Sequence, residues 1–372
     1  MRVLLAAAVS LATAAVSAAG AAGPHAVVNL VSMGSGTISA FAQDGPLIAW
    51  FTRDPNRCNT VHVRSLANGL HAELPKQAGA RNVTCRWGVG ASPVTLAVAG
   101  KTSDVLWTLH ASSPLEFDYL VGAGYGDQRE RRFQELAHTN RGAGLWFGGV
   151  VGNGTTLAYG VTSVDYEDEA GCLAGTAPCA MKIAGGGVYR VVGRQPPKLI
   201  PGTRPAVAVA ASDGRIAYVE TGAITKEGKP VAGADATIEV VDAASGRVVS
   251  SIRPAGAPVA IALSPHVLAT LEKTRLGLRL AWYALSSGSR TATGSVPVAV
   301  ATTPALTASD QLVVFHVGRS IRAVEIATGR VRSLVTAAAR PIGLSIEGSR
   351  LAWAENRKHG ARIRAFYVTG RG

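Results

Sequence analysis

The chain has 372 residues, of which 47% are hydrophobic and only 16% charged, so the composition excludes a disordered chain and supplies a sizeable core. The 43 glycines show no collagen period and aromatic residues reach only 6%, which favours many short elements joined by turns over long helices. The formal net charge is +13, but the basic residues are spread along the chain, mostly singly and without interleaved aromatic residues, so we expect no nucleic-acid partner.

Residues 1–23 have the pattern of a cleaved signal peptide. Met1 and Arg2 form a short basic start, an Ala/Leu/Val stretch follows to Ala15, and Val16-Ser17-Ala18 offers a small-residue cleavage pattern. An uncleaved anchor is the alternative, although the stretch is only weakly apolar for a membrane span. We therefore expect a protein that is secreted or held in the cell envelope, with residues 24–372 as one mature domain and no stable membrane span after cleavage.

Four cysteines follow the leader, and an even number in an exported chain favours two disulfides. They are Cys58, Cys85, Cys172 and Cys179. Their spacing matches no zinc finger or ribbon. We predict the pairs Cys58 with Cys85 and Cys172 with Cys179, with four reduced thiols as the alternative, and we expect no cofactor.

A short pattern recurs seven times along the chain: turn residues, an apolar strand centred on a small or aliphatic residue, and a second alternating strand downstream. The seven copies of the first strand are Leu47-Ile48-Ala49-Trp50, Thr95-Leu96-Ala97-Val98, Thr156-Leu157-Ala158-Tyr159, Arg215-Ile216-Ala217-Tyr218, Val267-Leu268-Ala269-Thr270, Gln311-Leu312-Val313-Val314 and Arg350-Leu351-Ala352-Trp353. Their spacing of about 39 to 61 residues suits one four-stranded blade each. The repeat predicts an all-β protein, a seven-bladed β-propeller, because a sandwich or several β-domains would not require a sevenfold pattern.

The innermost strands and the closure of the ring can also be predicted. Val207–Ala210, Val259–Leu263 and Ile342–Ser345 are apolar with small residues, as crowding around a central channel requires. The last repeat ends without an outermost strand, whereas the mature chain begins with one at about Val27–Val31. We predict that this N-terminal strand completes the seventh blade.

The second blade allows more than one interpretation because the segment Gly122–Gly144 is an insertion. Either Arg131–Leu136 is its outermost strand, or Phe117–Val121 is. The insertion could instead protrude as a partner-binding arm.

The turn Ser212-Asp213-Gly214-Arg215-Ile216-Ala217-Tyr218 is similar to the Ser-Pro-Asp-Gly-x-x-Ile-Ala-Phe/Tyr repeat of TolB-like and other WD40-like bacterial propellers. Partial copies are Ser264-Pro265-His266-Val267-Leu268-Ala269, Ser309-Asp310-Gln311-Leu312-Val313 and Glu347-Gly348-Ser349-Arg350-Leu351-Ala352-Trp353. The resemblance implies the propeller fold. The shared motif covers a turn between two strands of a blade and does not indicate what the ring binds.

Motifs for catalysis are absent from the sequence: it has no Gly-x-Ser-x-Gly, no His-Glu-x-x-His, no phosphate-binding loop and no EF-hand spacing. Its eight histidines are scattered without metal-ligand spacing. His316 and His359, near loops, are the ones to examine if the protein is an enzyme.

Three loops are longer than their counterparts: Thr52–Thr60 in the first blade, Ser163–Gly186 in the third and Glu220–Ala236 in the fourth. All three join the second strand of a blade to its third, so they share one face with the connections between blades. We call this the loop face and predict that it binds a partner. Its candidate binding residues are Arg53, Asp54, Arg57, Asp165, Glu167, Asp168, Glu169, Lys226 and Lys229.

Asp165, Glu167 and Asp168 are also candidate calcium ligands, because Ca²⁺ prefers carboxylate and carbonyl oxygens. The simpler interpretation is a solvated acidic loop stiffened by a small disulfide ring. A charge contact with Lys226 and Lys229 of the neighbouring loop is also possible.

These features predict a non-enzymatic, monomeric, exported scaffold that binds a protein or an anionic envelope component through the loop face of blades 1, 3 and 4. The alternative is a hydrolase or lyase at the mouth of the channel, which would need at least three ionisable side chains converging at one channel end. A purely structural role is the third possibility.

Overall fold

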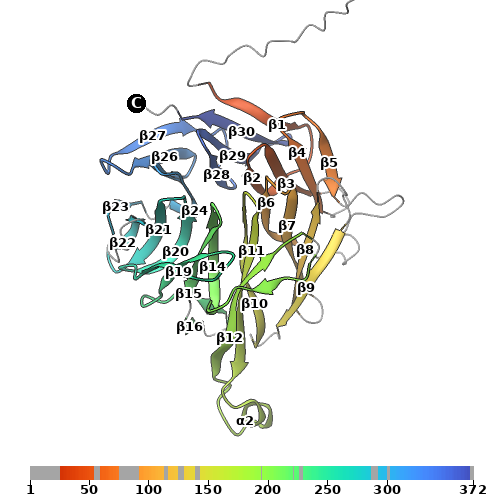
Figure 1. The fold of residues 1–372 in the computed structure, drawn as a ribbon, viewed down its shortest axis with the longest axis vertical. Coiled ribbons are helices and arrows are strands. Elements are labelled where there is room, and N and C mark those ends of the chain that lie inside the picture. Colours follow the sequence, from red (N-terminus) through yellow and green to blue (C-terminus); the bar gives the residue numbers. More distant parts are fainter. Residues whose placement is uncertain are drawn as a thin grey trace, which may run out of the picture.

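The computed structural model describes residues 26–53, 59–74, 92–112, 116–124, 130–138, 143–193, 195–220, 222–225, 229–285, 292–299 and 302–368. These residues form seven four-stranded antiparallel blades around a central channel (Figure 1). Blades 2 and 3 are joined into one continuous sheet by a single backbone pairing between His138 and Gly144. The predicted all-β fold, a seven-bladed β-propeller, is confirmed.

Each blade runs from an innermost strand at the channel to an outermost strand at the rim. The innermost strands are β2 (Ile38–Asp44), β6 (Ser92–Ala99), β10 (Gly144–Asn153), β14 (Ala206–Ser212), β20 (Ala257–Leu263), β24 (Thr302–Ala308) and β28 (Leu344–Glu347). The second strands are β3 (Leu47–Arg53), β7 (Asp104–Ser112), β11 (Thr156–Tyr166), β15 (Arg215–Glu220), β21 (Val267–Thr274), β25 (Leu312–Val317) and β29 (Arg350–Asn356). The third strands are β4 (Asn59–Ser65), β8 (Glu116–Gly124), β12 (Met181–Val191), β18 (Ile238–Asp242), β22 (Gly277–Ala284), β26 (Ser320–Glu325) and β30 (Ala361–Tyr367). The outermost strands are β5 (His71–Leu74), β9 (Glu130–His138), β13 (Lys198–Leu199), β19 (Val248–Ile252), β23 (Gly294–Val298), β27 (Val331–Thr336) and β1 (Val28–Met33).

The hydrophobic core is divided among the spaces between neighbouring blades. Each of the seven buried clusters in the described residues combines side chains from two adjacent blades. The second strands supply most of this burial: Ile216, Ala217 and Tyr218 of β15, for example, are fully buried. Because a blade buries both of its faces only between two neighbours, the apolar repeat requires a closed ring.

The N-terminal strand closes the ring as predicted. β1 lies antiparallel to β30, with Val28 opposite Ala365 and Met33 opposite Ala361, so the two ends of the chain share blade 7. This pairing covers the edge that β30 would otherwise expose.

Blade 2 differs from the sequence-based assignment by one strand. The copy at Thr95–Val98 belongs to the innermost strand β6, and the second strand is β7. Both strand types are apolar with small residues, so only the turn distinguishes them, and here Ser103 carries a positive φ of 58° before β7. Arg131–Leu136 lies in the outermost strand β9 and Phe117–Val121 in the third strand β8, which confirms the first of the two alternatives.

The blades present two unlike faces. The loop face carries the turns between second and third strands and the connections between blades, and we call the opposite side, with the turns between first and second strands, the turn face. Two further elements extend the loop face: the hairpin of β16 (Ala223–Ile224) and β17 (Pro230–Val231) in blade 4, and the helix α2 (Glu169–Ala174) in blade 3. In the part of the chain that the structure describes, no helical segment has the length and hydrophobicity of a membrane span.

Candidate functional site

Among the residues that the structure describes, the largest departure from the ring is an arm in blade 3, which we define as residues 163–185. It contains the ends of β11 and β12 with α2 between them, and it projects beyond the outline of the ring (Figure 1). Both ends of the predicted loop Ser163–Gly186 are therefore strand, since the two strands stay paired out to Tyr166 and Met181. Gly186 adopts a φ of +131°, and a Cβ there would lie 2.2 Å from the carbonyl oxygen of Val161, so only glycine fits at the base of the arm.

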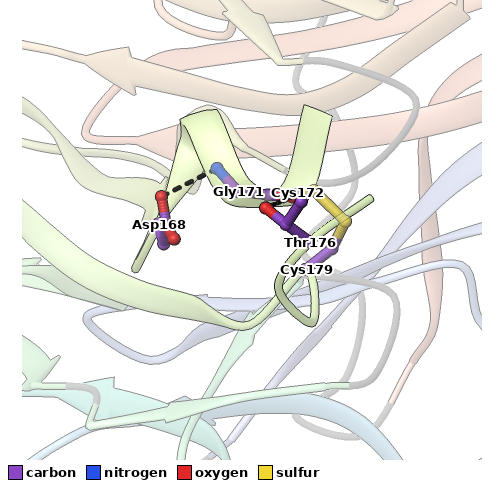
Figure 2. The surroundings of a disulfide bond; sticks show 5 residues. All are labelled: Asp168, Gly171, Cys172, Thr176 and Cys179. Carbon is purple, nitrogen blue, oxygen red and sulfur yellow. Dashed lines mark hydrogen bonds between the residues drawn. A yellow bond between two sulfur atoms is a disulfide. The ribbon is translucent and has the colours of Figure 1, made fainter. Parts of the chain in front are cut away.

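The tip of the arm is braced by its own contacts (Figure 2). Asp168 caps α2 by accepting a hydrogen bond from the backbone nitrogen of Gly171 at 2.9 Å. Cys172, within α2, forms a disulfide with Cys179, as predicted. The backbone nitrogen of Glu167 donates to the carbonyl oxygen of Ala180 at 2.9 Å, which continues the ladder to the base of the helix.

The surface of the arm combines acidic and apolar side chains. Asp165, Glu167, Asp168 and Glu169 are all exposed, and Leu173 on α2 is 69% exposed. Lys182 lies opposite Asp165 across the strand pair. An acidic, partly apolar projection thus stands on a strongly basic protein.

The remaining predicted rim residues are only partly visible. Lys229 is exposed in the turn before β17, where its backbone oxygen accepts a hydrogen bond from Thr225. Asp54, Arg57, Lys226, Cys58 and Cys85 lie outside the described residues, as do the side chain of Arg53 and the predicted signal peptide. Although β16 lies close to β12, no ion pair joins Lys229 to the arm's carboxylates within the described part of the chain.

The channel opens on the turn face into a cavity of about 840 Å³. Its ionisable lining residues come from the turns of five blades: Asp44, Lys101, Asp213, Asp310 and Glu347. Ser264 and Pro265 line it from blade 5. A second cavity of about 310 Å³ lies along the innermost strands and is lined mainly by their Ala, Val and Leu residues.

Asp44 links three blades at this mouth. Its Oδ2 atom accepts hydrogen bonds at 2.6 Å from the backbone nitrogens of Gly100 in blade 2 and Gly154 in blade 3, and its Oδ1 accepts one from Asn153. Asp44 is only 4% exposed. A Cβ on Gly100 would lie 2.4 Å from the carbonyl oxygen of Asp44, so this approach also requires glycine.

Blade 7 is joined to blade 1 by a similar contact. The guanidinium of Arg350 donates to Gln43 Oε1 at 3.0 Å and to the carbonyl oxygen of Gly45 at 2.6 Å. Gln43 in turn donates to the carbonyl oxygen of Ser345 at 2.9 Å. The point where the two chain ends meet is therefore held on the turn face as well as by β1.

Hydrogen bonds on the turn face also join other pairs of neighbouring blades. Asn153 Oδ1 accepts from the backbone nitrogen of Asp213 at 2.8 Å, which joins blades 3 and 4. Arg215 donates to the carbonyl oxygen of Pro265 at 2.8 Å, which joins blades 4 and 5. The backbone nitrogen of Ile346 donates to Thr307 at 3.1 Å between blades 7 and 6.

Asp310 closes the seam between blades 5 and 6. It accepts hydrogen bonds from the hydroxyl of Ser264 at 2.8 Å and the backbone nitrogen of His266 at 3.1 Å, and the His266 ring lies 2.9 Å away. Burial opposes ionisation, but these hydrogen bonds hold the pKa of Asp310 below its ordinary value. Burial and the nearby Asp44 carboxylate raise the pKa of Glu347.

On the loop face, buried carboxylates hold the connections that enter blades 5 and 7. Glu355 is fully buried; it accepts from the backbone nitrogens of Ala338 and Ala339 at 2.9 and 3.2 Å and pairs with Arg362. Glu272, also fully buried, accepts from the backbone nitrogen of Ala255 at 3.1 Å. Burial opposes ionisation, but the hydrogen bonds from Arg362 and Ala339 keep the pKa of Glu355 below its ordinary value.

The two histidines singled out from the sequence differ in access. His316 is fully buried, and burial lowers its pKa, while its Nδ1 lies 3.0 Å from the carbonyl oxygen of Gly318. His359 is exposed at the turn between β29 and β30. The fold does not bring them together with the channel mouth, because neither lines that cavity.

The described residues contain no group of three His, Cys, Asp or Glu side chains placed to hold a metal ion. Asp165, Glu167 and Asp168 are thus not gathered into a ligand set, and Asp168 serves as a helix cap. At the channel mouth, Asp44 and Asp310 are occupied by the contacts between blades. Neither Asp44 nor Asp310 was predicted from the sequence as a site residue. The pairs Asp44-Gly45 and Glu347-Gly348 do stand at matching places in their repeats.

The sequence matches no protein-family model, and no curated protein is similar enough to it to establish a relationship. Solved structures resemble the fold. The β-propeller domain of the Trilobed protease from Pyrococcus furiosus, described as having an open velcro topology, superposes with a TM-score of 0.56 at 10% identity, covering 89% of this chain and 95% of that one.

Two further structures show the same likeness. The β-propeller domain of Myceliophteria thermophila Cps50 (Swd1) gives a TM-score of 0.52 at 13% identity, covering 92% of this chain and all of that one. Pyrococcus horikoshii acylaminoacyl peptidase gives 0.55 at 12% identity, covering 90% of this chain but 53% of that one. At such identities the likeness concerns the fold alone. The chain is therefore a seven-bladed β-propeller whose structural neighbours are WD40 and other β-propeller domains.

Proposed function

We propose that this protein is an exported binding scaffold that captures a protein partner through the arm of blade 3. The observation that carries the proposal is the arm itself: two paired strands, a capped helix and a disulfide order a segment that projects beyond the ring. Ordering a chain segment costs conformational entropy, and nothing in the packing between blades requires this one. An arm stiffened before binding loses less entropy when a partner docks.

The chemistry of the tip suits a protein interface. Leu173 and the half-buried Tyr166 and Met181 offer apolar anchors, and Glu167 and Glu169 surround them with negative charge. Protein interfaces commonly place such anchors at the centre and charged groups at the rim. The complementary partner would present an apolar pocket bordered by basic side chains.

Export is supported by the Cys172–Cys179 disulfide, since disulfides persist mainly in oxidising compartments. The alternative of a hydrolase or lyase at the channel mouth has less support. Of its four lining carboxylates, Asp44 and Asp310 are committed to contacts between blades.

The test is site-specific photo-crosslinking in the producing cell. A photoreactive residue at Leu173 on the arm should yield a discrete protein adduct, whereas the same residue at Val331 or Val248, exposed at the opposite face, should not. In a variant with Glu167→Gln and Glu169→Gln, the adduct from position 173 should weaken, because the acidic border is lost. Equal adduct formation from all three positions, or none from position 173, would refute the proposal.

A further inference from the structure

A second charged surface lies on the loop face of blades 5 to 7. Its members are exposed cations at the end of β21, in the turns between second and third strands, or in the connection that enters blade 7: Lys273, Arg275, Arg319, Arg340, Arg357 and Lys358. We call this set the basic crescent. The sequence suggested a diffuse positive charge, because these residues are far apart along the chain and only the ring aligns them.

The cations stand at the tips of three neighbouring turns. Arg275 lies in the turn from β21 to β22, Arg319 in the turn from β25 to β26, and Arg357 with Lys358 in the turn from β29 to β30. Equivalent turns of successive blades project on the same side of the ring. The charges are therefore spread across one face rather than gathered in a groove.

The acidic residues of the same segments do not offset this charge. Glu272 and Glu355, at the ends of β21 and β29, are fully buried and hold backbone nitrogens of the entering connections. In the described turns and connections of blades 5 to 7 on this face, no carboxylate is exposed. The crescent thus presents a positive field that its own surroundings leave uncompensated.

The crescent is also held firmly where blades 6 and 7 meet. Arg319 donates to the carbonyl oxygen of Ala338 at 3.2 Å, and Glu355 accepts from the nitrogens of Ala338 and Ala339. Arg340 follows directly and lies close enough to His316 to help lower the pKa of that ring, after burial. These hydrogen bonds hold the connection that carries Arg340 against the turn that carries Arg319.

One apolar side chain stands among the cations. Leu276, at the apex of the blade 5 turn next to Arg275, is fully exposed at 101% of its reference area. A cationic turn with an apolar apex suits the boundary between anionic headgroups and acyl chains. A soluble polyanion would offer Leu276 no apolar phase.

We propose that the basic crescent adheres to an anionic lipid membrane, with Leu276 inserted at the headgroup level. This surface is separate from the arm, so the inference does not rest on the arm's capture of a protein. Adhesion would keep the exported ring at a membrane surface without a spanning segment.

The test measures partition of the purified mature protein onto vesicles of phosphatidylcholine, with or without phosphatidylglycerol. Binding is expected only with phosphatidylglycerol. The triple variant Arg275→Gln, Arg357→Gln and Lys358→Gln should lower the partition coefficient roughly 100-fold, at about five-fold for each cation removed. Leu276→Ser should lower it further on the same vesicles.

The matched control removes the same charges from exposed sites on the opposite face: Lys101→Gln, Arg247→Gln and Arg330→Gln. Because both triples have the same net charge, a difference between them reports the location of the charge. Retained binding in the control supports the proposal. Equal loss in both triples, equal binding to vesicles without phosphatidylglycerol, or retention on polyphosphate without vesicle binding would overturn it.

Discussion

The Oδ2 atom of Asp44 lies 2.6 Å from the backbone nitrogen of Gly154, a residue two blades further around the ring and 110 positions along the chain. The same oxygen accepts a hydrogen bond from Gly100 in the blade between them. One buried carboxylate thus ties the turns of three blades together at the channel mouth. The stability of the contacts between the first three blades should therefore depend on the negative charge of Asp44.

Replacing Asp44 by Asn should destabilise the ring by about 3 kcal/mol. Both oxygens of the carboxylate accept hydrogen bonds, so the amide nitrogen of Asn would face a group that is itself a donor. Equilibrium unfolding in urea measures the change. Asp213→Asn is the matched control: Asp213 lines the same mouth but is exposed, so its replacement should cost no more than about 0.5 kcal/mol. Equal costs for the two variants would show that the contacts of Asp44 do not hold the blades.

Glu355→Gln should loosen the connection between blades 6 and 7. The variant leaves Arg362 and Arg364 without a buried countercharge and weakens the acceptor for Ala338 and Ala339, at a cost of about 3 kcal/mol. Hydrogen exchange at residues 338–343 should accelerate more than exchange in blade 4. The same change at Glu325, which is partly exposed and pairs with Arg332, should leave that segment unchanged.

His62 should make stability depend on pH. Its ring packs against those of Trp50 and His71, which also stack on each other. Burial, followed by repulsion from His71, lowers the pKa of His62 from 6.5 to about 4. The unfolded chain therefore binds this proton at a higher pH than the folded one, so the contribution is fully present above pH 6.5 and is lost as pH falls toward 4, by at most about 3 kcal/mol.

The difference should disappear in His62→Gln, whose unfolding free energy would vary less across that range. His359→Gln, at an exposed turn, serves as the control and should keep the wild-type slope. Identical slopes in the wild type and the His62 variant would be inconsistent with the buried environment described for this ring.

The double variant Cys172→Ser and Cys179→Ser should loosen the arm but not the ring. Closing so short a loop contributes roughly 2 to 3 kcal/mol, and here that energy acts on a segment outside the packing between blades. Limited proteolysis should cut the variant within residues 167–180 while thermal unfolding of the ring shifts little. A large drop in ring stability would show that the arm is part of the core.

The blade pattern could be predicted because it follows from burial. Ala49, Ala217 and Ala352 recur at matching places in strands that must fit between two blades, and all three are fully buried. The repeat also contains a recurring glutamate whose role the sequence analysis did not predict. Glu220, Glu272 and Glu355 each stand three residues after the alanine of their copy, and each takes part in holding a connection between blades.

Other features could not be predicted because they depend on contacts between distant segments. Gly100 and Gly154 meet Asp44 only when the ring closes, and Thr95–Val98 fits an innermost strand as well as a second one until its turn is located. The basic crescent likewise requires three separate turns to be placed on one face.

If the arm is the binding element, removing its tip without disturbing the ring should abolish capture of the partner. Tyr166 and Met181 are paired across the hairpin, so residues 167–180 can be replaced by the two-residue turn Asn-Gly. The measurement is the set of proteins that co-purify from the cell envelope, quantified for the wild type and this variant, with the Asp213→Asn protein as a folded control. We predict that the variant keeps the wild-type unfolding free energy and loses the partner that crosslinks to position 173, whereas unchanged recovery of that partner would contradict the claim.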